Sequence, residues 1–186
     1  MLSGTNADEA RYWIGEVGGF RVYKYAIPVL FGSIRDRFRT VDKPFADAFL
    51  TMVKGDFTWR FTEFMNELLF RVPAVRQAEL HAESGGKHYM YYWTEQSHLE
   101  HYGACHAVEL AYVFNNLNDT IYTGKKADPA LAAAVQQMWV NFAKTGDPST
   151  DEYKWTPYDS TDRMTMLLGK RIHCRGVCSE QTDQET

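Results

Sequence analysis

Residues 88–94, HYMYYWT, constrain the fold more than any other part of this chain. Their aromatic density favours a buried strand, whereas the segments on both sides repeat apolar residues at helical spacing. Helices that alternate with buried strands pack on the faces of a sheet. The sequence therefore predicts an α/β fold.

Helical patterns precede this strand in three places. Apolar spacing predicts helices over residues 45–53, which end at Gly55, over residues 57–68, and over residues 73–83. Pro73 suits the first turn of the third helix. We expect that helix to stop at Gly85 and Gly86, because glycine accepts the backbone conformation that ends a helix.

The clearest helix pattern follows the strand. Asp128-Pro129 opens it and Gly146 stands where a cap is expected, and its apolar face comprises Leu131, Val135, Met138 and Phe142. Two short segments complete the pattern: residues 164–168 suit an edge strand, and residues 1–3 resemble the end of a strand. Two or three strands cannot cover the apolar faces of four or more helices. We therefore expect the chain to contain part of a larger sheet, with an unpaired edge at residues 1–3.

Composition bounds the class of protein. The chain has 186 residues, 45% hydrophobic and 24% charged, which is typical of one globular domain. A net charge of −4 argues against nucleic-acid binding, which requires clustered positive charge. The apolar stretch 25–31 is too short to cross a membrane. The opening residues lack an export signal, which weakly favours the cytoplasm without fixing a location. Residues 1–178 are expected to form the domain, and residues 179–186 a polar flexible tail.

Cysteine and histidine spacing does not favour a metal centre. Cys105, Cys174 and Cys178 are three in number, and we expect free thiols rather than a disulfide framework. His98 and His101 stand one residue closer together than in the zinc motif H-x-x-E-H. We expect solvated loop histidines there, no metal and no cofactor.

Three stretches resemble a known family. GTNADEARYW at 4–13 is similar to the pattern G-x-N-x-D-E-G-x-x-F, and GACHAVELAYVF at 103–114 is similar to G-x-x-H-G-x-E-L-x-F-V-F. MWVNFAKTGDP at 138–148, followed by WTPY at 155–158, matches a late helix and the turn after it. These three stretches and their order in the chain resemble those of the type-B carboxylesterases, whose relatives include the cholinesterases and the cholinesterase-like adhesion proteins. The resemblance implies the C-terminal portion of an α/β-hydrolase fold, with few sheet strands and several packed helices.

The resemblance assigns catalytic roles to two residues. It makes Glu9 the acid and His106 the base of a Ser-Glu-His triad. A serine hydroxyl needs a neutral imidazole to accept its proton, and the imidazole needs a carboxylate that fixes its tautomer. Without the resemblance, Glu9 is equally a carboxylate at a helix start and His106 a core or loop histidine.

The nucleophile and the oxyanion hole are expected upstream of this sequence. In α/β-hydrolases the serine lies in a G-x-S-x-G turn that precedes the acid and the base. Ser84, in AESGG, resembles that turn, but a helix precedes it and a strand follows, so we expect a helix-ending turn. The chain by itself is therefore expected to be inactive.

The chain departs from the family patterns at two positions, and the roles of one carboxylate and one aromatic stripe are also considered. Ala10 and Ala107 stand where the family has glycine, and a positive φ at either would strain the backbone. Glu109 is expected to be a buried hydrogen-bond acceptor near the imidazole. The stripe of Phe57, Phe61 and Phe64 suits an acyl pocket or plain core, and the sequence leaves both open.

The resemblance implies a carboxylic ester hydrolase that acts on a small-molecule ester in the complete enzyme. Expected partners are the N-terminal portion of the same hydrolase or a second copy of the chain. The alternative is a non-catalytic cholinesterase-like binding module. Retention of Glu9 and His106 favours the hydrolase, whereas Ala10 and Ala107 favour the binding module.

Overall fold

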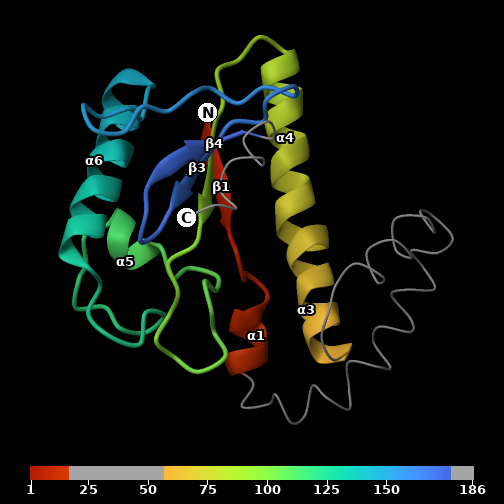
Figure 1. The fold of residues 1–186 in the computed structure, drawn as a ribbon, viewed down its shortest axis with the longest axis vertical. Helices are drawn as coiled ribbons and strands as arrows, with labels where there is room; N and C mark the ends of the chain where they lie inside the picture. The colour runs from red at the N-terminus through yellow and green to blue at the C-terminus, as the bar shows by residue number, and fades with distance from the viewer. Residues whose placement is uncertain (17–56, 177–186) are drawn as a thin grey trace, which may run out of the picture.

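The computed structural model describes residues 1–16 and 57–176, and Figure 1 shows their arrangement. The elements in chain order are β1 (Leu2–Asn6), α1 (Arg11–Glu16), α3 (Phe57–Asn66), the π-helical segment η1 (Glu67–Arg71), α4 (Val72–Glu83), β2 (Tyr89–Trp93), α5 (Leu110–Val113), α6 (Pro129–Thr145), β3 (Thr165–Leu168) and β4 (His173–Arg175). The helix predicted over residues 45–53 and the predicted tail lie outside the described residues. Within the described ranges, no helix is both long and apolar enough to cross a membrane.

The four described strands form one mixed sheet in the order β1-β2-β3-β4. β1 pairs parallel with β2, β2 pairs parallel with β3, and β4 turns back antiparallel to β3. The predicted α/β class with few strands is confirmed. The prediction of an edge strand at residues 164–168 is wrong, because β4 covers the outer side of β3. β1 lies at the other edge and has a single described neighbour.

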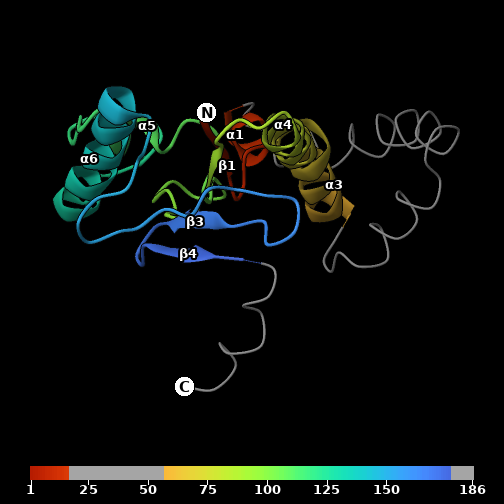
Figure 2. The ribbon, with the colours of Figure 1, turned by 90° about the horizontal axis from the view of Figure 1, so that it is seen from above.

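Helices cover the sheet on both faces. Figure 2 shows α5 and α6 on one side and α3 and α4 on the other. Side chains alternate along a strand, so Trp93 on β2 and Leu168 on β3 share the face that packs with Val135 and Met138 of α6. Met90 lies on the opposite face, where it packs with Ala78 of α4 and with Tyr158.

The predicted ends of α6 are confirmed. The Asp128 carboxylate accepts hydrogen bonds from the backbone N–H groups of Ala130 and Leu131, at 2.8 and 3.0 Å. These groups have no partner inside the helix, so the carboxylate satisfies them. Gly146 ends the helix with a φ of +77°, a conformation that glycine adopts without strain.

Residues 57–83 form one helical run rather than the two helices predicted. The helix does not begin again at Pro73, because η1 joins α3 to α4 without a break. The backbone N–H of Val72 donates to the carbonyl of Glu67, five residues earlier, as in a π-helix. Pro73 has no N–H to donate, and the wider π-helical turn before it allows the helix to continue through this position. The predicted end at residue 83 is correct, and Gly85 follows with a φ of +82°.

Candidate active site

Two loops meet where the parallel strands β1 and β2 end. Figure 1 shows β1 running from the N-terminus to α1, and the loop after β2 lies beside it. The backbone N–H of Asp8 donates to the carbonyl of Ala104 at 2.9 Å, and the N–H of Ala104 donates to the Asp8 carboxylate at 2.8 Å. These reciprocal bonds hold residues 96 positions apart in the sequence at one edge of the site.

Gly103 allows this close approach. Its φ is +58°, and a Cβ atom built there would lie 2.4 Å from an Asp8 carboxylate oxygen. A side chain at position 103 would therefore push the two loops apart. Asp8 also pairs with Arg11 at 2.7 Å, which fixes its second carboxylate oxygen.

The meeting of the loops brings Glu9 and His106 together. Oε2 of Glu9 lies 2.7 Å from Nδ1 of His106. Oε1 of Glu9 accepts a hydrogen bond of 2.8 Å from the backbone N–H of Asn6, so both carboxylate oxygens are held. The Glu9 side chain is 8% exposed and that of His106 47% exposed, so the pair extends from the interior to the surface.

The electrostatic surroundings make the His106 imidazole a stronger base. The hydrogen bond that the His106 ring donates to Glu9 raises the pKa of His106, burial opposes this, and the charges of Glu9 and Glu109 raise the pKa further. A carboxylate on Nδ1 fixes the neutral tautomer with the lone pair on Nε2. The ring is therefore arranged to accept a proton at Nε2.

Glu109 is the hydrogen-bond acceptor expected near the imidazole, although it is partly rather than fully buried. Its carboxylate accepts a hydrogen bond from the Asn6 side-chain amide, and burial raises its pKa. The same amide donates to the carbonyl of Cys105 at 2.8 Å. Burial raises the pKa of the Cys105 thiol to about 12, so this thiol is not a nucleophile at neutral pH.

A groove of about 550 Å³ opens beside His106. Leu69, Phe70 and Pro73 from the helical run line it opposite Tyr91. Trp13 stacks on Phe70 with ring centroids 5.7 Å apart, and both rings lie within 6 Å of the His106 ring. The aromatic residue that lines this groove is Phe70; Phe64, from the stripe considered in the sequence, is buried, and the side chains of Phe57 and Phe61 lie outside the described set.

The two alanines that replace family glycines differ in backbone conformation. Ala107 has a φ of +67°, in the left-handed region where a Cβ is strained. Ala10 is not among the described residues with positive φ, and its N–H donates to the Asn66 side chain at 2.6 Å. The predicted strain therefore applies to Ala107 alone.

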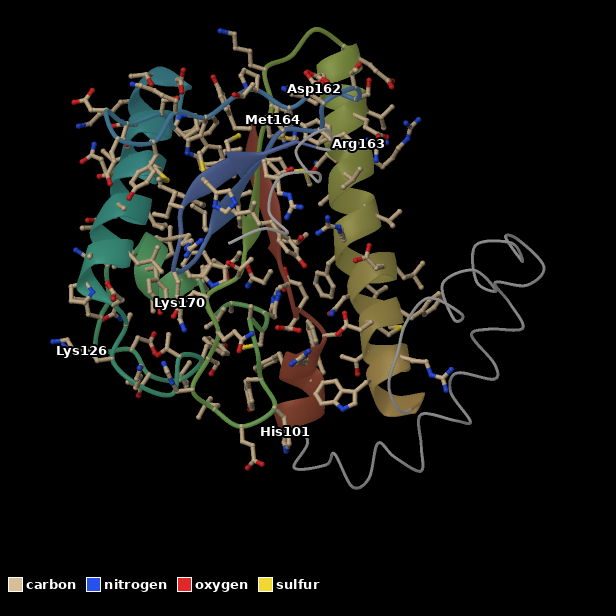
Figure 3. All side chains as sticks on the ribbon, in the orientation of Figure 1. His101, Lys126, Asp162, Arg163, Met164 and Lys170 are labelled. Atoms are coloured by element: carbon tan, nitrogen blue, oxygen red, sulfur yellow. The ribbon has the colours of Figure 1, made fainter. Side chains whose placement is uncertain are left out.

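The remaining candidates lie away from the pair. Ser84 follows α4, and its hydroxyl donates to the carbonyl of His81 at 2.7 Å, so it forms the predicted helix-ending turn. His98 and His101 are exposed in the loop after β2, and Figure 3 shows His101 beside α1. Among the described residues, no three His, Cys, Asp or Glu side chains form a metal-binding group.

Sequence reasoning missed three residues that position the site. Asn6 and Asp8 lie within the family pattern at residues 4–13, and their position at the end of a strand is the signal that could have identified them. Asn66, at the end of α3, contacts the loop through the N–H of Ala10 and the carbonyl of Ala7. No sequence pattern connects Asn66 to residues more than fifty positions earlier.

A mostly parallel sheet covered by helices, with a carboxylate and an imidazole on loops at the ends of two parallel strands, is an α/β-hydrolase arrangement. The chain belongs to the Carboxylesterase family, whose pattern matches residues 37–184. The match includes His106 and begins after Glu9.

Similar proteins and solved structures support this family assignment. The chain is 35% identical to the para-nitrobenzyl esterase of Bacillus subtilis over 118 residues, 58% of this chain and 23% of that protein. It is 32% identical to the bile salt-activated lipase of Bos taurus over 57% of this chain and 19% of that protein. A solved thermophilic PNB esterase matches with a TM-score of 0.73 and 27% identity, over 94% of this chain and 35% of that one. The chain therefore spans about a fifth to a third of the proteins it resembles.

Proposed function

We propose that the chain supplies the acid and the base of a serine carboxylic ester hydrolase, with Glu9 as the acid and His106 as the base. The hydrogen bond of 2.7 Å between Glu9 and Nδ1 of His106 carries the proposal. Family membership supports it, and the groove beside the imidazole offers room for an ester. The substrate class is a small-molecule carboxylic ester.

In the proposed mechanism, His106 takes the proton of a serine hydroxyl at Nε2 as the serine attacks the ester carbonyl. Glu9 holds the tautomer and stabilises the imidazolium that forms. His106 then returns the proton to the leaving alcohol, and an acyl-enzyme remains. Water repeats the sequence with His106 as the base, which releases the acid and restores the serine.

The nucleophilic serine and the oxyanion hole belong, in this proposal, to residues outside this sequence. Ser84 does not supply the nucleophile, because it lies at the end of α4 and bonds to a helix carbonyl. The chain by itself is therefore expected to hydrolyse little or no ester.

The edge of β1 that has no neighbour among the described strands is the proposed contact for the N-terminal portion of such a hydrolase. Tyr89 donates to the carbonyl of Met1 and Ala7 donates to the carbonyl of Trp93, so odd-numbered residues of β1 bond to β2. The backbone groups of Leu2 and Gly4 then point away from the sheet. An added parallel strand would satisfy them and would carry its own terminal loop to the side where His106 lies.

The strained Ala107 favours a second candidate function, that of a non-catalytic cholinesterase-like binding module. Ala107 stands next to the base where the family pattern has glycine, and its φ of +67° makes it the departure that favours the binding module. The residue at the nucleophile position of the partner portion distinguishes the two functions. Serine there supports the hydrolase, and any other residue supports the binding module.

The test pairs this chain with a portion that contains the nucleophile turn, by co-expression or from the parent gene, and measures hydrolysis of short-chain p-nitrophenyl esters. His106→Ala should lower kcat/KM by roughly 10³-fold or more, since removal of one triad member has effects of this size. His98→Ala removes an exposed histidine and should leave the rate unchanged. Equal rates for His106→Ala and the unsubstituted protein would exclude His106 from the mechanism.

A further inference from the structure

A second cavity, of about 340 Å³, lies between α4 and the sheet face that carries Met90, Thr165 and Arg175. The strand register places these three residues on the same face. Arg71 from η1, Arg163 from the loop before β3, and Arg175 from β4 all line the cavity. Figure 3 shows Arg163 beside α4. No carboxylate is among the described residues that line it, so its walls are positively charged.

Neighbouring groups compensate the arginines only in part. Arg163 pairs with Glu79 at 2.8 Å. Arg71 lies over the Tyr92 ring at 4.5 Å and 3.8 Å from Glu67, a distance that gives a weak ion pair. Within the described part of the chain, Arg175 has no carboxylate at ion-pair distance. The cavity therefore retains positive charge.

Tyr158 supplies an independent observation that points to a ligand-binding role for this cavity. Its side chain lines the cavity, the residue is 3% exposed, and its hydroxyl has no hydrogen-bond partner among the described residues. Buried hydroxyl groups in folded proteins are nearly always paired. Burial raises the pKa of Tyr158, so the hydroxyl remains a hydrogen-bond donor at neutral pH.

We propose that this cavity binds a small organic anion whose carboxylate or phosphate group accepts hydrogen bonds from Tyr158 and the arginines. Guanidinium groups offer paired donors that match the geometry of both anions. Val75, Met90 and Leu167 line the rest of the cavity and provide an apolar surface for the body of the ligand. The volume lies in the range of small-molecule sites. The site does not depend on Glu9 or His106.

Calorimetric titration of the full 186-residue chain with benzoate, phenyl phosphate and inorganic phosphate tests the site. Benzoate, phenyl phosphate or both should bind, and which of them binds more tightly assigns the anionic group. Arg175→Gln should weaken that binding by about tenfold, as expected for loss of a charged hydrogen bond. Lys126→Gln removes the same charge on the side of the molecule near α6 (Figure 3) and should have no effect.

Absence of binding by both aromatic anions would overturn the proposal, as would binding of inorganic phosphate alone. Equal weakening by Arg175→Gln and Lys126→Gln would also overturn it, because the attraction would then depend on net charge rather than on a site.

Tyr158→Phe distinguishes a ligand-binding role from a structural one. The substitution removes only a hydroxyl that has no described partner, so the melting temperature of the ligand-free chain should stay the same or rise. Affinity for the aromatic anion should fall by about tenfold. A lower melting temperature with unchanged affinity would show that the hydroxyl bonds within the protein, and the proposal would fail.

Discussion

One carboxylate governs both the protonation and the orientation of His106. The Glu9 hydrogen bond is the largest cause that raises the pKa of the imidazole. We therefore predict that Glu9→Gln lowers the His106 pKa, which NMR titration of the ring protons measures without any assay of activity. The ring signals of His98, exposed in the loop after β2, serve as the internal control in the same spectra.

The same pKa shift predicts a pH dependence of stability. Because the folded pKa of His106 lies above the unfolded value of about 6.5, the ion pair with Glu9 stabilises the fold below that value. This contribution is lost as the pH rises through the folded pKa. Glu9→Gln should therefore destabilise the chain more at pH 5.5 than at pH 9 in urea unfolding. A destabilisation that is larger at pH 9 would contradict the proposed charge state of the pair.

Ala107 offers a prediction that rests on backbone conformation alone. An alanine in the left-handed region costs about 1–2 kcal/mol, and glycine there has no such strain but loses more chain entropy on folding. Ala107→Gly should therefore raise the free energy of unfolding by about 0.5–1 kcal/mol. Urea unfolding measures the change.

Ala10→Gly is the matched control, because it restores the other family glycine at a position without positive φ. It should destabilise the chain by about 0.5–1 kcal/mol, since only the entropic cost applies. Destabilisation by both substitutions would show that Ala107 is not strained.

At the scale of elements, α6 illustrates how a local sequence signal controls a helix. The Asp128 carboxylate satisfies two backbone N–H groups of the first turn. Asp128→Ala should lower the free energy of unfolding by about 1 kcal/mol, the usual cost of a lost N-cap. Thermal or urea unfolding measures the change. Asp151→Ala removes an exposed carboxylate after the same helix and should change stability by less than about 0.5 kcal/mol.

Elements whose signals are local could be predicted from the sequence, and those that depend on distant partners could not. α6 and β2 carry their own caps and aromatic pattern, and both form where the sequence predicts them. β4, His173–Arg175, has three residues and no pattern of its own, and it is a strand because β3 lies beside it. The π-helical turn of η1 was not predicted, because Pro73 suggested the start of a new helix rather than the continuation of the preceding helix through a wider turn.

The same distinction applies to the site. The pairing of Glu9 with His106 was predicted from the motifs around each residue, and in the structure the Glu9 carboxylate lies 2.7 Å from Nδ1 of His106. Asn66 was not found, because its contact with the Glu9 loop exists only after α3 packs beside it. Phe70 lies against His106 as a result of the helical register that η1 sets.

At the scale of the whole molecule, the sheet ends at β1, whose outer side has no described neighbour, and exposed apolar side chains lie on the face that carries Tyr91 of the adjacent strand β2. Leu110 and Phe114 of the α5 region and Val140 of α6 are exposed and line a groove next to Tyr91. An unpaired strand flanked by apolar surface favours pairing with another chain. We therefore expect the isolated chain to associate with itself when no hydrolase portion covers this edge.

Proline substitutions in β1 distinguish strand pairing at this edge from nonspecific hydrophobic association. The N–H of Leu2 points away from β2, so Leu2→Pro should leave the sheet intact and block an added strand, which sedimentation would detect as a smaller species. The N–H of Ser3 points toward β2, so Ser3→Pro should instead destabilise the fold, because it removes a bond of the sheet. If the unsubstituted chain sediments as a compact monomer and unfolds cooperatively, β1 is not an open edge in solution, and the proposed contact with an N-terminal portion loses its physical basis.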